Sequence, residues 1–272
     1  MIKTFWYKNM EVSYFEHNCN SNKNLIIIPN LFKSYYDYRH IIQNYMFDYN
    51  IFSLNINLLH LNKTEINFAQ TSFLIELFEE FINIININKI SIIAHSFGSS
   101  LILYNLKKLN DKLDKIIIWG PITNYFMNIN NDFTNFYKLS KKSHYEDLYN
   151  FSYIYPHVLT INSKNINKMH AYLKENRLKL NTKFKINFLK FSNDSENLLI
   201  KNLKSFNKNL YYFYILEDDF YLDYGYNLLF KKFVKNCYIK EIDFKDPLYA
   251  KSWLKDYDIE TSKILLEKKW NY

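Results

Sequence analysis

Residues 94–98 (Ala-His-Ser-Phe-Gly) have the arrangement with the clearest chemistry: a serine with a small residue two positions away on each side. A serine on a sharp strand-to-helix turn requires such neighbours, because larger side chains would collide across the strained backbone. The turn exposes the Ser96 hydroxyl, and the helix N-terminus that follows presents free N–H groups to a developing negative charge. The segment therefore predicts a nucleophilic serine beside an anion-stabilising helix end.

The segments on either side of Ser96 fit such a turn. Residues 89–94 form an apolar, β-branched run typical of a strand buried on both faces, and residues 97–109 have a helical pattern. Further strands are expected at residues 4–7, 12–15, 25–28, 51–56 and 115–119, and further helices at 34–47 and 67–85. This alternation predicts an α/β fold with a mostly parallel sheet, helices on both faces and an antiparallel pair at the N-terminal edge.

The pattern changes at residues 124–208, which are rich in Asn, Lys, Tyr and Phe. Beyond this segment, strands are expected at 210–216 and 237–242 and helices at 224–234 and 260–270. We therefore expect one α/β core formed by residues 1–123 and 209–272. A mainly helical cap at 124–208 would interrupt this core after its sixth strand.

The Ser96 segment and the order of these elements together resemble the α/β-hydrolase superfamily, in its serine-hydrolase and lysophospholipase-like branch with a helical lid. The resemblance covers nearly the whole chain in element order and is specific around residues 94–100 and 216–219. It implies a triad in the order nucleophile, acid, histidine. The acid that it implies is Asp219, at the end of the strand expected at 210–216, with Asp218 as the alternative.

The histidine of such a triad is missing from its usual place after the last strand, because no histidine follows His170. Ser96 therefore needs an unusual base, and His60, after the strand at 51–56, is the first candidate. Three histidines of the expected cap are further candidates: His144, His157 and His170. The histidines expected to be packing or structural residues are His17, His40 and His95.

The resemblance also implies an oxyanion hole formed by two backbone N–H groups, those of Leu31 and Phe97. Leu31 lies in residues 29–32 (Pro-Asn-Leu-Phe), where the family usually carries His-Gly. A backbone donor does not depend on its side chain, so the hole can survive this change. The loop nevertheless loses the conformational freedom that glycine would give it.

The composition points to no further class of ligand. The net charge is +8, but the lysines form no long run, and the bias toward Asn, Lys, Ile, Tyr and Phe matches AT-rich codons, so we expect no nucleic-acid partner. Two distant cysteines form no metal motif, and no apolar run approaches the ~20 residues that span a bilayer. We expect no cofactor, no metal, no transmembrane segment and, without a signal-peptide pattern, a cytoplasmic location.

Three interpretations stay open. The first is a serine hydrolase or acyltransferase that acts on a small-molecule ester or thioester through Ser96, with Asp219 orienting a base. The second is a degenerate member of the same fold that acts as a binding or scaffold protein. The third is another α/β domain in which the serine turn is accidental, although the chain has no G-x-G-x-x-G for the dinucleotide-binding version. The sequence predicts neither the acyl substrate nor the oligomeric state.

Overall fold

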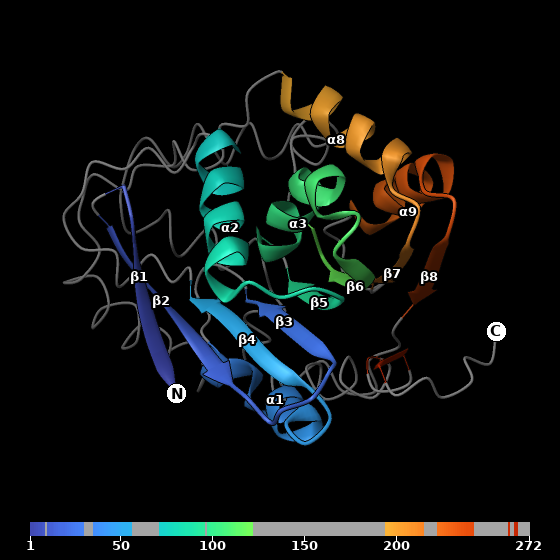
Figure 1. The fold of residues 1–272 in the computed structure, drawn as a ribbon. Helices are drawn as coiled ribbons and strands as arrows, with labels where there is room; N and C mark the ends of the chain where they lie inside the picture. The colour runs from blue at the N-terminus through green and yellow to red at the C-terminus, as the bar shows by residue number, and fades with distance from the viewer. Residues whose placement is uncertain are drawn as a thin grey trace, which may run out of the picture.

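The computed structural model describes residues 1–8, 10–29, 35–55, 71–95, 97–121, 194–214, 222–241, 261 and 264–265. The eight strands found among these residues form one sheet in the order β1-β2-β4-β3-β5-β6-β7-β8 (Figure 1). The strands are β1 (Ile2–Tyr7), β2 (Met10–His17), β3 (Asn24–Ile28), β4 (Asn50–Asn55), β5 (Ile90–His95), β6 (Leu113–Trp119), β7 (Asn209–Tyr214) and β8 (Cys237–Glu241). The helices are the 3-10 turn η1 (Tyr35–Tyr38), α1 (Arg39–Tyr45), α2 (Thr71–Ile85), α3 (Phe97–Leu109), α8 (Asp194–Ser205) and α9 (Leu222–Phe233).

The sheet is parallel except at its N-terminal edge. Strand β2 pairs antiparallel with both β1 and β4, and every other neighbouring pair of described strands is parallel. The antiparallel edge expected from the sequence is thus confirmed. The central strands β3 and β5 are buried along their whole length apart from His95, which is what parallel strands covered on both faces require.

Helices cover both faces of the sheet, and the strand residues alternate between two apolar cores. In β3, Ile26 and Ile28 join the core under α2, α3, α8 and α9, whereas Leu25 and Ile27 join the core under α1 and the helical residues Ile264 and Leu265. This period of two is the pleat of a strand that sends successive side chains to opposite faces. Figure 1 shows the two layers, with α1 on the opposite side of the sheet from α2, α3, α8 and α9.

Helix α8 belongs to the packed core, although it lies inside the range expected for the cap. Its Leu199 and Leu203 are fully buried, and Asn202 Nδ2 donates hydrogen bonds to the carbonyl oxygens of Leu103 (3.1 Å) and Tyr104 (2.6 Å) in α3. Residues 122–193 lie outside the described part of the chain. The division at 124–208 therefore stays a prediction.

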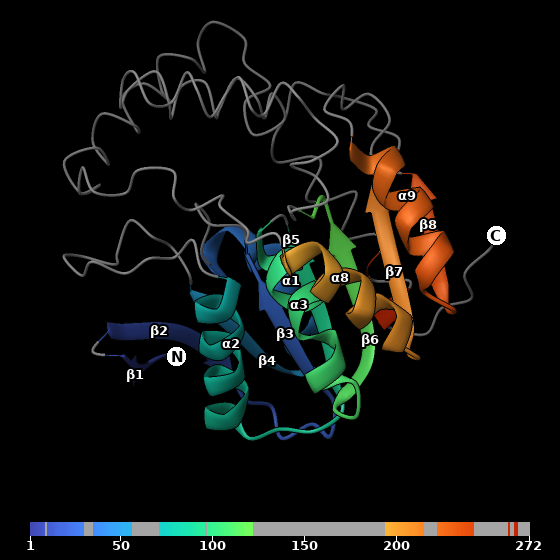
Figure 2. The same ribbon diagram turned by 90° about the horizontal axis from the view of Figure 1, so that it is seen from above.

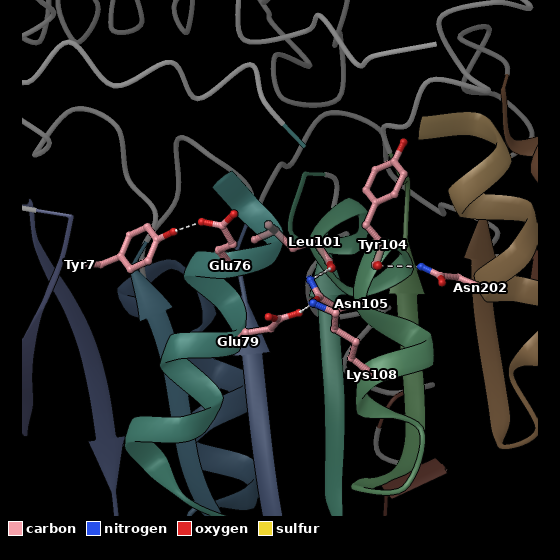
Figure 3. A network of polar contacts seen from close by, with 8 residues as sticks. All are labelled: Tyr7, Glu76, Glu79, Leu101, Tyr104, Asn105, Lys108 and Asn202. Carbon is pink, nitrogen blue, oxygen red and sulfur yellow. Dashed lines mark hydrogen bonds and ion pairs between the residues drawn. The ribbon is translucent and has the colours of Figure 1, made fainter. Parts of the chain in front are cut away.

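Polar contacts join the helices of this face in a row from β1 to α8 (Figure 3). The Tyr7 hydroxyl donates to Glu76 Oε2 of α2 at 2.8 Å, and the Lys8 ammonium contacts the same oxygen at 2.5 Å. Glu79 of α2 forms an ion pair with Lys108 of α3. These contacts fasten the N-terminal hairpin to α2 and α2 to α3.

Replacing Glu76 with glutamine is expected to lower the free energy of unfolding slightly at neutral pH. Lys8, and then the Tyr7 hydroxyl, hold the pKa of the Glu76 carboxyl below its usual value, so the folded protein favours the charged form. The stability that this shift contributes is fully present above the carboxyl's ordinary pKa. It is lost as the pH falls through the lowered pKa of the folded protein. Urea unfolding of both proteins at neutral pH and at about pH 2 checks this.

Glu80→Gln is the control for that measurement, because Glu80 lies on the same helix and has no ion pair recorded among the described residues. This control substitution is expected to leave the free energy of unfolding unchanged at both pH values. If the stability difference for Glu76→Gln persisted in acid, the ionised carboxylate would not be its source.

Candidate functional site

The junction between β5 and α3 is unusually short. β5 ends at His95 and α3 begins at Phe97, so Ser96 is the one residue between a buried strand and a helix. Connections from strand to helix usually contain roughly two to six residues, so this change of direction is sharp. Ser96 itself lies outside the described residues, whereas β5 and α3 on either side of it are described.

Gly98 is in close contact with the end of the neighbouring strand β3. A Cβ atom at Gly98 would lie 2.4 Å from the carbonyl oxygen of Ile28, 2.7 Å from Ile28 Cγ2 and 2.8 Å from the carbonyl oxygen of Pro29. Two of these three atoms belong to the backbone and cannot rotate away. The small residue that the sequence pattern requires after the serine is therefore required here by packing against β3.

Ser99 fastens the first turn of α3 to two strand ends. Its side chain is fully buried, and its Oγ lies 2.7 Å from the carbonyl oxygen of Ala94 and 3.1 Å from that of Trp119. The hydroxyl has one proton to share between these acceptors, at the carboxyl ends of β5 and β6. The helix N-terminus is thereby held at a fixed place over the sheet.

His95 packs beneath this junction, as the sequence led us to expect. Its Nδ1 lies 2.6 Å from the Tyr38 hydroxyl, and its ring centroid lies 5.9 Å from that of Trp119. The rings of Tyr38 and Trp119 are stacked at 6.4 Å. Nothing in the sequence pointed to Tyr38, because it meets His95 across 57 positions and sits in a 3-10 turn that has no recognisable motif.

Four of the five candidate site residues lie outside the described part of the chain: Leu31, His60, Ser96 and Asp219. The fifth, Phe97, opens α3, which is where a helix N-terminal N–H donor is expected. The strands that precede the other four are β3, β4, β5 and β7, which run parallel, so their carboxyl ends meet at one edge of the sheet. β3 and β5 are direct neighbours, with Ile28 opposite Ala94.

Of the described histidines other than His95, His17 has a structural contact and His40 is exposed. His17 lies opposite Ile51, near the amino end of β4, and its Nε2 lies 2.7 Å from the carbonyl oxygen of Met46. His40 is exposed on α1. The structural role expected for His17 is confirmed. His60, His144, His157 and His170 lie outside the described residues, so the identity of a base stays a prediction.

Other reactive groups in the described part of the chain are few. Burial raises the pKa of the Cys237 thiol to about 12, which keeps it protonated and poorly nucleophilic at neutral pH. Within the described ranges, no three His, Cys, Asp or Glu side chains come together as a metal site would require. No helix among the described residues is both long and apolar enough to cross a bilayer.

No protein-family model and no curated protein sequence matches the chain. Solved structures match it over nearly its whole length. An alpha/beta hydrolase enzyme from a Medee basin deep-sea metagenome library superposes with a TM-score of 0.73 at 13% identity, covering 99% of each chain. A serine hydrolase from Cycloclasticus zankles gives a TM-score of 0.72 at 12% identity over 100% of this chain and 99% of that one.

A third similar structure is an epoxide hydrolase from Bacillus megaterium, with a TM-score of 0.68 at 13% identity over 98% of this chain and 100% of that one. At such identities the similarity concerns the fold. Together with the strand order and the sharp β5–α3 junction, it establishes that this chain has the α/β-hydrolase fold.

Proposed function

We propose that the protein is a serine hydrolase or acyltransferase that attacks an ester or thioester carbonyl with the Ser96 hydroxyl. The observation that supports this most is the β5–α3 junction. One residue links strand to helix there, and Gly98 packs against the backbone of β3. A junction of this shape raises the intervening side chain above the sheet, beside the first N–H groups of the helix.

The other parts of the proposed mechanism follow from the parallel sheet. The N–H of Phe97 at the start of α3, together with that of Leu31 after β3, would stabilise the negative charge on the attacked carbonyl oxygen. Asp219 follows β7 and would orient the base, for which His60 is our candidate. The acyl group would pass to Ser96 and then to water, or to an alcohol or thiol in the acyltransferase case.

A fluorophosphonate probe tests the proposal, because it phosphonylates an activated serine and needs no knowledge of the substrate. The wild-type protein is expected to be labelled on the peptide that contains Ser96, and Ser96→Ala is expected to abolish labelling. Ser91→Ala is the matched control, because Ser91 is a buried serine nearer the amino end of β5. A folded wild-type protein that resists labelling would contradict the proposal.

A labelled protein then allows the base and the substrate class to be identified. Single His→Ala variants of His60, His144, His157 and His170 are expected to include one with a labelling rate reduced by about a hundredfold or more. A panel of activated esters and thioesters is expected to show turnover. Similar folds include an epoxide hydrolase and a haloalkane dehalogenase variant, so an epoxide and a haloalkane belong in the same panel.

A second candidate function is binding without turnover. The observation that favours it is the absence of any histidine after His170 in the sequence, where the resemblance implies the base. Under this alternative the protein folds normally, Ser96 is not labelled, and no member of the panel is consumed. The labelling experiment therefore separates the two functions.

A further inference from the structure

Most lysines in the described part of the chain lie at one edge of the folded sheet, although they form no long run along the sequence. The turns that precede the parallel strands lie side by side there, opposite the β5–α3 junction; in Figure 2 the arrowheads of β6 and β7 point away from this edge. Four hydrogen bonds join the turns: Asn50 N–H to Lys23 O (2.9 Å), Asn24 Nδ2 to Asn88 O (2.9 Å), Ile90 N–H to Lys112 O (2.8 Å) and Leu210 N–H to Asn236 O (3.0 Å). We call this the lysine-rich edge.

The charge of this edge is strongly one-sided. Its turns, and the last turns of α3, α8 and α9, contain ten lysines: Lys23, Lys89, Lys107, Lys108, Lys112, Lys204, Lys208, Lys231, Lys232 and Lys235. The acidic residues found with them in the described part of the chain are Asp48, Asp111 and Asp114, and Glu79 is paired with Lys108. The six strands from β4 to β8 spread these charges over about 24 Å.

Balancing the helix dipoles explains only part of this pattern. A lysine in the last turn of a helix stabilises its negative end, which accounts for those of α3, α8 and α9. It does not account for the lysines in the turns, such as Lys23, Lys89 and Lys235, which are exposed.

Large apolar side chains are also exposed at this edge. Phe47, in the turn before β4, is 84% exposed, and Ile84, in the last turn of α2, is 39% exposed. A partner that is both anionic and apolar would take these two side chains out of water while it contacts the lysines. A lipid bilayer with anionic headgroups has this combination, whereas a nucleic-acid duplex offers no apolar layer at its phosphate surface.

We propose that the lysine-rich edge binds the surface of an anionic lipid bilayer. Phe47 and Ile84 enter the headgroup region, and the lysines contact the lipid phosphates and carboxylates. The carboxyl ends of the parallel strands, with the β5–α3 junction, then face the aqueous side. The proposal is independent of any chemistry at Ser96.

Sedimentation with vesicles of phosphatidylcholine, with and without phosphatidylserine, tests the proposal on the full chain. The protein is expected to bind the vesicles with phosphatidylserine and to leave the others unbound. Binding is expected to weaken as salt rises toward about 1 M, where screening shortens the reach of the charges to roughly 3 Å. An absence of binding to anionic vesicles at low salt would overturn the proposal, as would equal binding to both kinds of vesicle.

Two pairs of variants locate the surface. The triple variant Lys107→Gln, Lys208→Gln, Lys235→Gln is expected to bind about a hundredfold more weakly, at roughly a factor of five for each lysine. The control removes the same charge at the other half of the sheet, through Lys3→Gln, Lys8→Gln and Lys240→Gln. Equal weakening by both triples would show attraction by net charge alone and would contradict a defined edge.

The second pair compares two exposed aromatic residues. Phe47→Ser is expected to weaken binding roughly tenfold, because its ring leaves water on binding. Trp6→Ser is expected to have no effect, because Trp6 is 70% exposed on β1, away from this edge. Circular dichroism of each variant checks that it folds. Tight binding to duplex DNA or RNA, with none to vesicles, would assign the edge to a nucleic acid and overturn the proposal.

Discussion

Replacing Gly98 with alanine is expected to lower the free energy of unfolding by about 3 kcal/mol or more. The added methyl group would lie 2.4 Å from the Ile28 carbonyl oxygen and 2.8 Å from that of Pro29. Neither backbone atom can yield unless α3 and β3 move apart, and that movement would strain the Ser99 contacts with β5 and β6. Urea unfolding followed by circular dichroism measures the loss.

Gly120→Ala is the matched control for this substitution. Gly120 has a φ of +45°, and a Cβ there would meet nothing within 4 Å. Alanine at that site is strained only by its backbone conformation, at about 1 kcal/mol. If the two variants lost equal stability, crowding against β3 would not be the reason for glycine at residue 98.

Replacing Trp119 with alanine is expected to lower the free energy of unfolding by about 3–5 kcal/mol. The indole is fully buried at the end of β6, where it stacks on Tyr38 and packs against the His95 ring. The cavity left by the indole would loosen His95, the residue that precedes Ser96. We therefore also expect slower labelling of Ser96 by a fluorophosphonate, measured under conditions in which the variant stays folded.

Trp6→Ala provides the comparison, because that indole is 70% exposed on the edge strand β1. Its loss is expected to change stability by no more than about 0.5 kcal/mol and to leave the labelling rate unchanged. A Trp119→Ala protein as stable as Trp6→Ala would mean that the aromatic group under the junction does not support the fold.

Much of the fold could be predicted from the sequence because the central strands and helices have strong patterns of apolar residues. The strand expected at 89–94 is found at Ile90–His95, and the helix expected at 97–109 is found at Phe97–Leu109. Both elements have strong apolar patterns, and one of the chain's three glycines stands at their junction. The parallel sheet and its antiparallel N-terminal edge followed from the same alternation of elements.

The elements with weaker local signals were predicted less well. A helix was expected from residue 34, but Tyr35–Tyr38 form a 3-10 turn and α1 begins at Arg39. Tyr38 at the helix N-cap makes no side-chain capping bond, so no local signal marks this start. Its place is set instead by packing, since Tyr38 stacks on Trp119 and is only 2% exposed.

The location of the candidate site could be predicted from the sequence, but the residues that pack beneath it could not. The serine turn and the parallel strand ends around it follow from local pattern, and the structure has the junction that this pattern requires. The hydrogen bond between Tyr38 and His95, and the contact of Gly98 with Ile28, join residues far apart in sequence. A single sequence has no signal for such pairs, so the packing beneath Ser96 could not be foreseen.

The position of α8 has a consequence for the order in which the chain assembles. β6 and β7 are neighbours in the sheet, yet their paired residues Trp119 and Phe213 are roughly 90 residues apart, which makes closure of this loop slow. During synthesis the first six strands emerge well before α8. The side of α3 that Leu199 and Leu203 later cover is then open to water, so the nascent protein presents an apolar strip to chaperones until α8 arrives.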